Sequence, residues 1–193
     1  MKIRHFAIAI CLSLVSLSSH AIVFHIDGGT TENVSWNWDD INGPADPNPG
    51  QHAALTTFNG AQAANGEGVY LSGAGDVTYT YLGSEADNTN SIQATMGSTI
   101  FGNTFSNAGD TAIASQGAGA LDFGFFTNGE YTTAGNIINA VGATVNDFRI
   151  AVFRESANSI ILMFGDGLGD RDFDDLIVRA STCLLYTSDA ADE

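Results

Sequence analysis

The chain has 193 residues, of which 22 are Asp or Glu and only six are Lys or Arg, so its formal net charge is −16 at pH 7. This excess of negative charge disfavours binding to nucleic acids and to anionic membranes, which both attract basic proteins. It favours solubility and the binding of cations.

Residues 1–21 have the pattern of a secretory signal peptide. Lys2 and Arg4 precede an apolar run, and Ser19-His20-Ala21 is a small–x–small cleavage site. The run of about a dozen residues is too short to span a bilayer, which takes about 20. The alternative is a buried N-terminal helix of the folded domain. We expect export, and a mature chain that begins at Ile22.

Residues 22–182 are expected to form a single domain. Four arginines and no lysine stand against 19 acidic residues (22 less Asp189, Asp192 and Glu193), which gives this segment a net charge of −15. It contains no cysteine, so no disulfide can form in it even in an oxidising compartment. Its stability must come from one hydrophobic core, for which its length suffices.

Short apolar or alternating runs between turn residues predict an all-β protein, and no segment sustains a helical periodicity. The segment Asp39–Gly50, which holds all three prolines, is a predicted loop, and Gly135–Ala143 could form a short helix. These elements favour an antiparallel β-sandwich, jelly-roll-like. The predicted strands are Ile22–Ile26, Val34–Trp38, Ala54–Phe58, Gly68–Ser72, Asp76–Leu82, Ser91–Phe101, Leu121–Thr127, Phe148–Glu155, Ser159–Phe164 and Asp175–Ala180.

For two of these strands, the sequence also predicts which faces are buried. In Val77–Tyr81, apolar and threonine side chains alternate, so Val77, Tyr79 and Tyr81 should share one face. The run Ile160–Phe164 is apolar at every position, which predicts a central strand covered on both sides. We expect it to form a hairpin with the strand before it, through a turn at 156–159.

Five aspartates crowd the segment between the last two predicted strands, called here the acidic turn (residues 166–175). Alternation in an extended chain would bring Asp170, Asp172 and Asp174 to one side. Their oxygens suit calcium, which takes six to eight oxygen ligands. We therefore predict a structural Ca²⁺ site here. The aspartates are Asp166, Asp170, Asp172, Asp174 and Asp175.

The alternative is an acidic turn that holds no metal and is compensated by Arg171 or Arg179 and by its own backbone. Phe173 lies between the acids and is interpreted as a core anchor for the turn. A second turn, Glu85–Asn90, is rich in oxygen ligands, and we predict that Glu85, Asn88 or Asn90 completes the calcium shell. The other interpretation of this second turn is an Asx-rich loop.

Two segments carry a resemblance to known proteins. Gly169–Arg179, entered from a strand that ends in Phe164-Gly-Asp166, resembles the closing segment of exported bacterial proteins of unknown function, of the PEP-CTERM-sorted type with a D-x-D-[FY]-[ND]-D ending. Val77–Asn90 is similar to an aromatic-Leu-Gly-x-Glu-Ala segment of the same group. The resemblance implies export from a Gram-negative bacterium to its outer surface or exopolysaccharide matrix, often with biofilm functions. It implies no established activity.

The sorting tail of that group is not present in the sequence. Residues 183–193 instead resemble translated sequencing adapter, so we interpret them as a non-native read-through tail. The alternative is a genuine polar C-terminus. On the first interpretation, the chain is cut where a sorting tail would begin.

Other functions have less support. Trp36 with Trp38, and Tyr79 with Tyr81, could stack on sugar rings, which makes a polysaccharide-binding module the alternative function. The simpler interpretation, which we favour, is core or half-buried sheet aromatics. A glycoside-type hydrolase would need a pair of acids, and none of the 19 lies in a recognisable motif. The histidines lack zinc-ligand spacing. We expect a non-catalytic protein of the cell surface or extracellular matrix, with polysaccharide as its partner.

Overall fold

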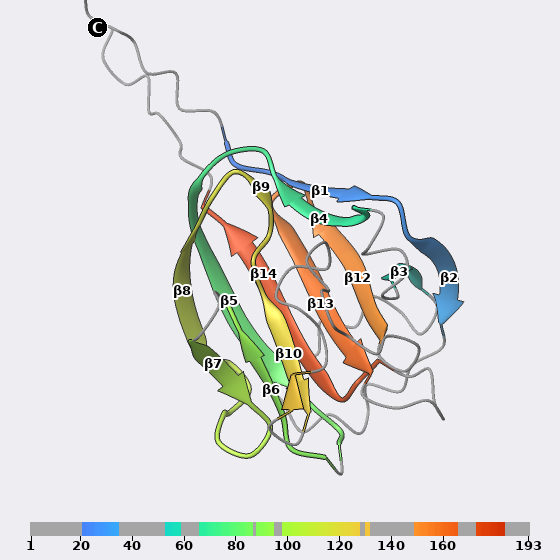
Figure 1. The fold of residues 1–193 in the computed structure, drawn as a ribbon, viewed down its shortest axis with the longest axis vertical. Coiled ribbons are helices and arrows are strands. Elements are labelled where there is room, and N and C mark those ends of the chain that lie inside the picture. Colours follow the sequence, from blue (N-terminus) through green and yellow to red (C-terminus); the bar gives the residue numbers. More distant parts are fainter. Residues whose placement is uncertain are drawn as a thin grey trace, which may run out of the picture.

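The computed structural model describes residues 21–34, 53–58, 66–86, 88–94, 98–127, 130–131, 149–165 and 173–183. In these residues the chain is all β (Figure 1). The strands are β1 (Phe24–Asp27), β2 (Thr30–Val34), β3 (Ala53–Phe58), β4 (Gly68–Leu71), β5 (Gly75–Gly83), β6 (Asn90–Gln93), β7 (Thr99–Gly102), β8 (Thr111–Gln116), β9 (Gly119–Ala120), β10 (Gly124–Thr127), β11 (Glu130–Tyr131), β12 (Arg149–Ser156), β13 (Ser159–Gly165) and β14 (Leu176–Thr182).

The strands form three antiparallel sheets in a layered arrangement. The largest has seven strands in the order β2-β3-β12-β13-β14-β5-β8. A four-stranded sheet, β11-β10-β6-β7, and a three-stranded sheet, β1-β4-β9, lie over it, and Figure 1 shows both in front of the large sheet. The predicted antiparallel β-sandwich is confirmed.

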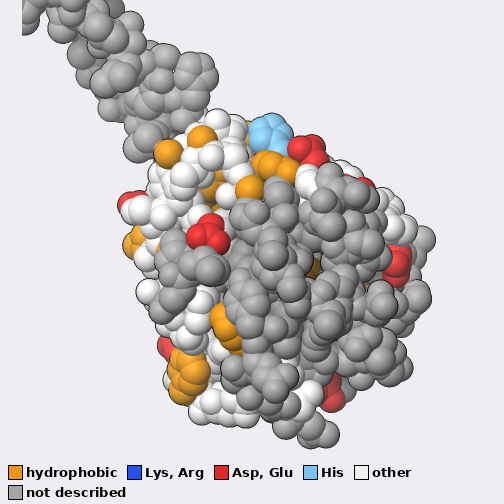
Figure 2. Space-filling model, viewed as in Figure 1, with side chains coloured by type: hydrophobic (Ala, Val, Ile, Leu, Met, Phe, Trp, Pro, Cys, Tyr) orange, Lys and Arg blue, Asp and Glu red, His pale blue; other side chains and the backbone are white. Residues whose placement is uncertain are grey.

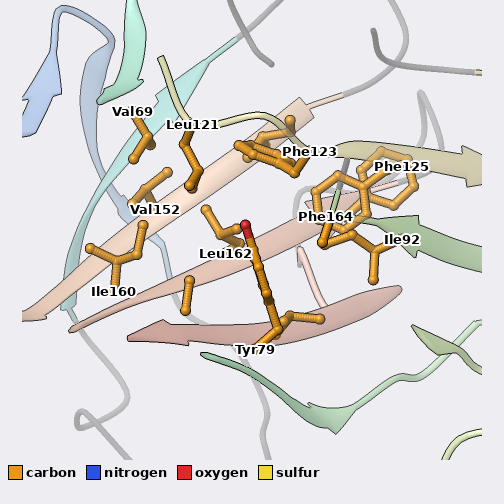
Figure 3. Close-up of a cluster of buried hydrophobic side chains, with 14 of the residues drawn as sticks. Val69, Tyr79, Ile92, Leu121, Phe123, Phe125, Val152, Ile160, Leu162 and Phe164 are labelled. Atoms are coloured by element: carbon orange, nitrogen blue, oxygen red, sulfur yellow. The ribbon is translucent and has the colours of Figure 1, made fainter. Parts of the chain in front are cut away.

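Strand β13 is the centre of the large sheet. Each residue of Ile160–Phe164 is fully buried, which confirms the predicted strand with cover on both faces. Alternate residues contribute to two different apolar clusters, as the period of two requires. Ile160, Leu162 and Phe164 belong to the cluster between the layers, part of which is drawn in Figure 3. Ile161 and Met163 belong to a second cluster on the opposite face, with Leu55, Leu82, Ala151, Phe173 and Ile177.

The pairing of β12 with β13 confirms the predicted hairpin, in which Val152 lies opposite Leu162. In β5 the predicted alternation is also confirmed. Val77, Tyr79 and Tyr81 are buried between the layers, whereas Thr78 and Thr80 are half-buried.

Three strand predictions need correction. The predicted strand Ser91–Phe101 is two antiparallel strands, β6 and β7, because Ile92 and Phe101 pair across a reversal of the chain and both enter the same core. Strand β2 (Thr30–Val34) was not predicted, and residues 35–38 of the predicted strand Val34–Trp38 lie outside the described residues. Strand β8 was not predicted, since Ile113 is its only large apolar residue and faces solvent, while the small Ala112 and Ala114 face the core.

The two ends of the expected domain meet. Thr182 Oγ1 donates a hydrogen bond of 2.6 Å to the carbonyl of Ile22, and the Val23 N–H donates to Ser72 Oγ. No helix in the described part of the chain is long and apolar enough to cross a membrane. Residues 1–20, the loop Asp39–Gly50, the segment Gly135–Ala143 and residues 184–193 lie outside the described residues.

Candidate functional site

The end of the acidic turn packs into the protein directly before β14. Asp174 and Asp175 are only 5% and 9% exposed. A carboxylate that is this buried is stable only with hydrogen bonds or a compensating charge. The other three predicted calcium ligands, Asp166, Asp170 and Asp172, lie outside the described residues.

Phe173 anchors this end of the turn, as predicted. Its side chain is 1% exposed and lies in the second apolar cluster with Met163 and Ile177. Its backbone has φ of 55°, a left-handed conformation that bulky residues rarely adopt. Such a conformation persists only when the surrounding structure enforces it. Burial of the ring therefore fixes the path of the chain into Asp174.

The second turn meets the acidic turn at the same end of the sandwich. The Glu85 N–H donates to the Asp174 carbonyl at 2.8 Å, and Asn90 Nδ2 makes a long, weak contact of 3.5 Å to the Asp175 carbonyl. The contact follows from the pairing of β5 with β14, in which Gly83 lies opposite Ile177. The structure therefore brings Glu85 and Asn90 beside the two described aspartates.

Asn90 joins the layers through its side chain. It is fully buried, and its Oδ1 accepts a hydrogen bond of 2.9 Å from Thr127 Oγ1 on β10. Its N–H donates to Asn103 Oδ1, and Asn103 Nδ2 donates to the Asn88 carbonyl. These bonds fix the second turn, in which Glu85 is exposed and Asn88 half-buried. Glu85 is thus the predicted additional ligand whose side chain has most access to solvent.

Arg179 pairs with Glu155 and not with Asp174 or Asp175, the described aspartates of the acidic turn, so the described residues give no support to this part of the sequence-based alternative. Its Nε and Nη2 each donate to a different carboxylate oxygen of Glu155 at 2.7 Å. Arg154 Nη1 donates to the Phe24 carbonyl. Both arginines whose side chains the structure describes are therefore bound elsewhere, and Arg171 lies outside the described residues.

The Glu155–Arg179 pair yields a pH prediction. Burial alone would raise the pKa of Glu155, but hydrogen bonds from Arg179 and Ser159 outweigh it and lower the pKa. The pair therefore contributes stability above the unfolded-state pKa of about 4.3 and loses it as the pH falls through the lower folded-state pKa. Glu155→Gln should cost about 0.5–1 kcal/mol at neutral pH, as for a partly exposed pair. Urea unfolding at several pH values checks this.

The matched variant is Arg179→Met, which removes the other member of the pair. In both variants, the stability difference from wild type should shrink on acidification. A difference that stays constant down to the lowest pH at which the domain folds would contradict the pair's role.

A polar hollow of about 350 Å³ lies next to the second turn. Its lining combines hydroxyl and amide side chains with the edge of one buried tyrosine. The sequence analysis did not predict it, although the polar run 102–110, with two asparagines, one threonine and one serine, was an available indication. The lining residues are Tyr81, Gly83, Ser84, Asn103, Ser106, Asn107 and Ala108.

Of the four aromatic residues that could stack on sugar rings, the structure describes only the two tyrosines. Tyr79 and Tyr81 are 0% and 4% exposed, so their rings are core and cannot stack on a ligand. Burial, together with nearby Asp122, raises the pKa of Tyr79, which keeps its hydroxyl neutral. Trp36 and Trp38 lie outside the described residues.

The surface is acidic, and Figure 2 shows scattered Asp and Glu side chains and no Lys or Arg among the coloured residues of that face. Within the residues that the structure describes, no group of three or more His, Cys, Asp or Glu side chains could hold a metal ion; that set does not include Asp166, Asp170 or Asp172. Comparison with protein-family models, curated proteins and solved structures finds no match for this chain.

Proposed function

We propose that this is an exported, non-catalytic protein of the outer cell surface or extracellular matrix of a Gram-negative bacterium, with a structural calcium ion in its acidic turn. The contact between Asp174 and Glu85 carries the proposal, because it joins the two oxygen-rich turns at one end of the sandwich. Support for export comes from the signal-peptide pattern of residues 1–21.

Calcium suits this place for reasons of charge and ligand type. Five aspartates within ten residues repel one another, and the two described arginine side chains are bound elsewhere. The proposed shell takes carboxylate oxygens from Asp170, Asp172 and Asp174, with Asp166 or Asp175 beside them and Glu85 from the second turn. Calcium accepts such irregular oxygen sets. By holding both turns, it would tie the start of β14 to the end of β5.

Calcium is expected to raise the thermal stability of the mature domain. Extracellular calcium sites have Kd values of about 10⁻⁴–10⁻³ M. Calcium at about 10–100 times Kd therefore adds roughly 1.4–2.7 kcal/mol to the free energy of unfolding. For a domain of this size, that corresponds to a rise in Tm of roughly 3–10 °C. Melting by circular dichroism, in calcium and in chelator at equal ionic strength, measures the shift.

The matched variants remove one carboxylate each. Asp174→Asn should abolish most of the calcium-dependent rise in Tm, whatever it does to the Tm in chelator. Asp76→Asn removes an exposed carboxylate that accepts a hydrogen bond from Ser115 on β8, and should leave the rise intact. The calcium site would be rejected by equal Tm values in calcium and chelator, or by equal losses in both variants.

A further inference from the structure

We propose that the polar hollow between the end of β5 and the turn after β7 binds a neutral sugar unit of an extracellular polysaccharide, with Phe105 as its apolar platform. The choice of polysaccharide rests on the proposed matrix function. The site itself is separate from the acidic turn. Four observations support it: the fixed polar lining, the lack of charge among the described lining residues, the exposed Phe105 on the same turn, and the position of the hollow at a rigid strand end.

The polar groups of the hollow are held in place by the protein and retain capacity for a ligand. Ser84 Oγ accepts from Tyr81 OH at 2.9 Å, and Ser106 Oγ accepts from the Gly102 N–H at 3.1 Å. A serine that accepts a hydrogen bond still has its own hydrogen to donate. Asn103 is fixed by its bonds to Asn90 and Asn88. Such preorganised groups lose little freedom on binding.

None of the described residues that line the hollow is charged, in a domain whose net charge is −15. Repulsion from the acidic surface disfavours anionic ligands, including acidic polysaccharides. The hydroxyls and amides would lose hydrogen bonds to water if an apolar ligand covered them. A neutral sugar satisfies both conditions, because its hydroxyls donate and accept hydrogen bonds and carry no charge.

Phe105 offers an exposed apolar surface on the turn that supplies part of the lining. It lies on the same turn as Asn103 and Ser106, and its side chain is 60% exposed. Its ring lies over Gly102, where an added Cβ would come within 2.4 Å of Phe105 Cε1. The ring therefore rests on the backbone and exposes its remaining surface. An exposed aromatic ring on a turn that lines a polar pocket can pack against the C–H face of a sugar.

The turn is held firmly against β5. The Tyr81 N–H donates to the Asp110 carbonyl at 2.9 Å, and the Gly109 N–H donates to the Tyr81 carbonyl at 2.8 Å. The Asn107 N–H donates to Asp110 Oδ2. Asn107 is exposed and lines the hollow. The site therefore stands on the end of a buried strand, which favours a defined binding geometry.

Titration of the ¹⁵N-labelled mature domain tests the proposal. The probes are maltotetraose, cellotetraose and laminaritetraose, with oligogalacturonate as the anionic comparison. At least one neutral probe should produce saturable shifts in the amide signals of residues 83–84 and 103–108, and oligogalacturonate should produce none. Phe105→Ala should weaken binding roughly tenfold, because the stacking surface is lost.

Ile113→Ala is the matched control, since it removes another exposed large apolar side chain, 69% exposed on β8. It should bind like wild type. The proposal is overturned if no neutral probe shifts these amides, if oligogalacturonate shifts them equally, or if Phe105→Ala binds as tightly as wild type. Repeating the titration in chelator separates the two proposals. If the amide shifts persist in chelator while calcium has no effect on Tm, only the calcium site is rejected.

Discussion

Replacing Phe164 with alanine is expected to lower the free energy of unfolding by about 3–5 kcal/mol, the usual cost of truncating a buried phenylalanine. Phe164 is fully buried near the end of β13, and its ring stacks on that of Phe125 with centroids 4.6 Å apart and planes 1° apart (Figure 3). Phe125 in turn meets Phe123 edge-on at 5.8 Å. These rings join the large sheet to the segment around β10. Loss of the Phe164 ring therefore opens a cavity between the layers.

Urea unfolding of the variant and of Phe105→Ala measures the effect. Phe105 is 60% exposed, so the same chemical change there should alter stability by no more than about 0.5 kcal/mol. Phe164→Leu keeps most of the volume and should cost less than alanine, which provides a folded variant if Phe164→Ala is too unstable to measure. Equal losses at positions 105 and 164 would contradict the assignment of the core.

The core could be predicted from the sequence because its pattern is local. The uninterrupted apolar run Ile160–Phe164 indicates a strand covered on both faces, and its neighbours show where the hairpin turns. Strand β8 lacks such a pattern, because an edge strand that packs through alanines presents little apolar surface on either face. Its existence depends on pairing with β5, which is a tertiary contact.

The meeting of the two turns could be predicted only as a hypothesis. Residues 85 and 174 are far apart in the sequence, and their contact depends on the register between β5 and β14. The place of Arg179 along β14 separates it from Asp174, the described end of the acidic turn. It lies five residues along the strand from Asp174, roughly 17 Å at the rise of an extended chain, and its side chain meets Glu155.

The hollow could not be predicted, because no motif marks it. It forms where the turn after β7 folds back onto the end of β5, and its lining comes from two segments with ordinary turn composition. Besides the polar run 102–110, a local indication is Gly102, which leaves room for the Phe105 ring. From the sequence alone, that glycine is indistinguishable from the many others in the chain.

Replacing Asn90 with alanine should lower the free energy of unfolding by about 3 kcal/mol. The change removes the hydrogen bond from Thr127 and the contact to the Asp175 carbonyl at a fully buried position. It also leaves the Thr127 hydroxyl buried without this partner, which costs about 1–3 kcal/mol in addition to the lost packing. Chemical denaturation of the variant measures the loss.

A double-mutant cycle with Thr127→Val separates the cost of the buried Thr127 hydroxyl from the cost of the lost packing. Valine has nearly the shape of threonine and no hydroxyl, so adding Thr127→Val to Asn90→Ala should restore part of the stability rather than add a second loss. Strict additivity of the two changes would contradict the buried bond between Asn90 and Thr127.

The same variant reports on the coupling between the two turns. Asn90 is the last residue of the second turn and the first of β6, and it contacts Asp175 at the end of the acidic turn, so Asn90→Ala loosens both turns. If calcium binds across these turns, part of its binding free energy must order them in the Asn90→Ala variant. This variant should therefore show a smaller calcium-dependent rise in Tm than wild type. Phe164→Ala, which acts through the core, should lower Tm equally with and without calcium. A calcium response that survives Asn90→Ala unchanged would place the ion within the acidic turn alone.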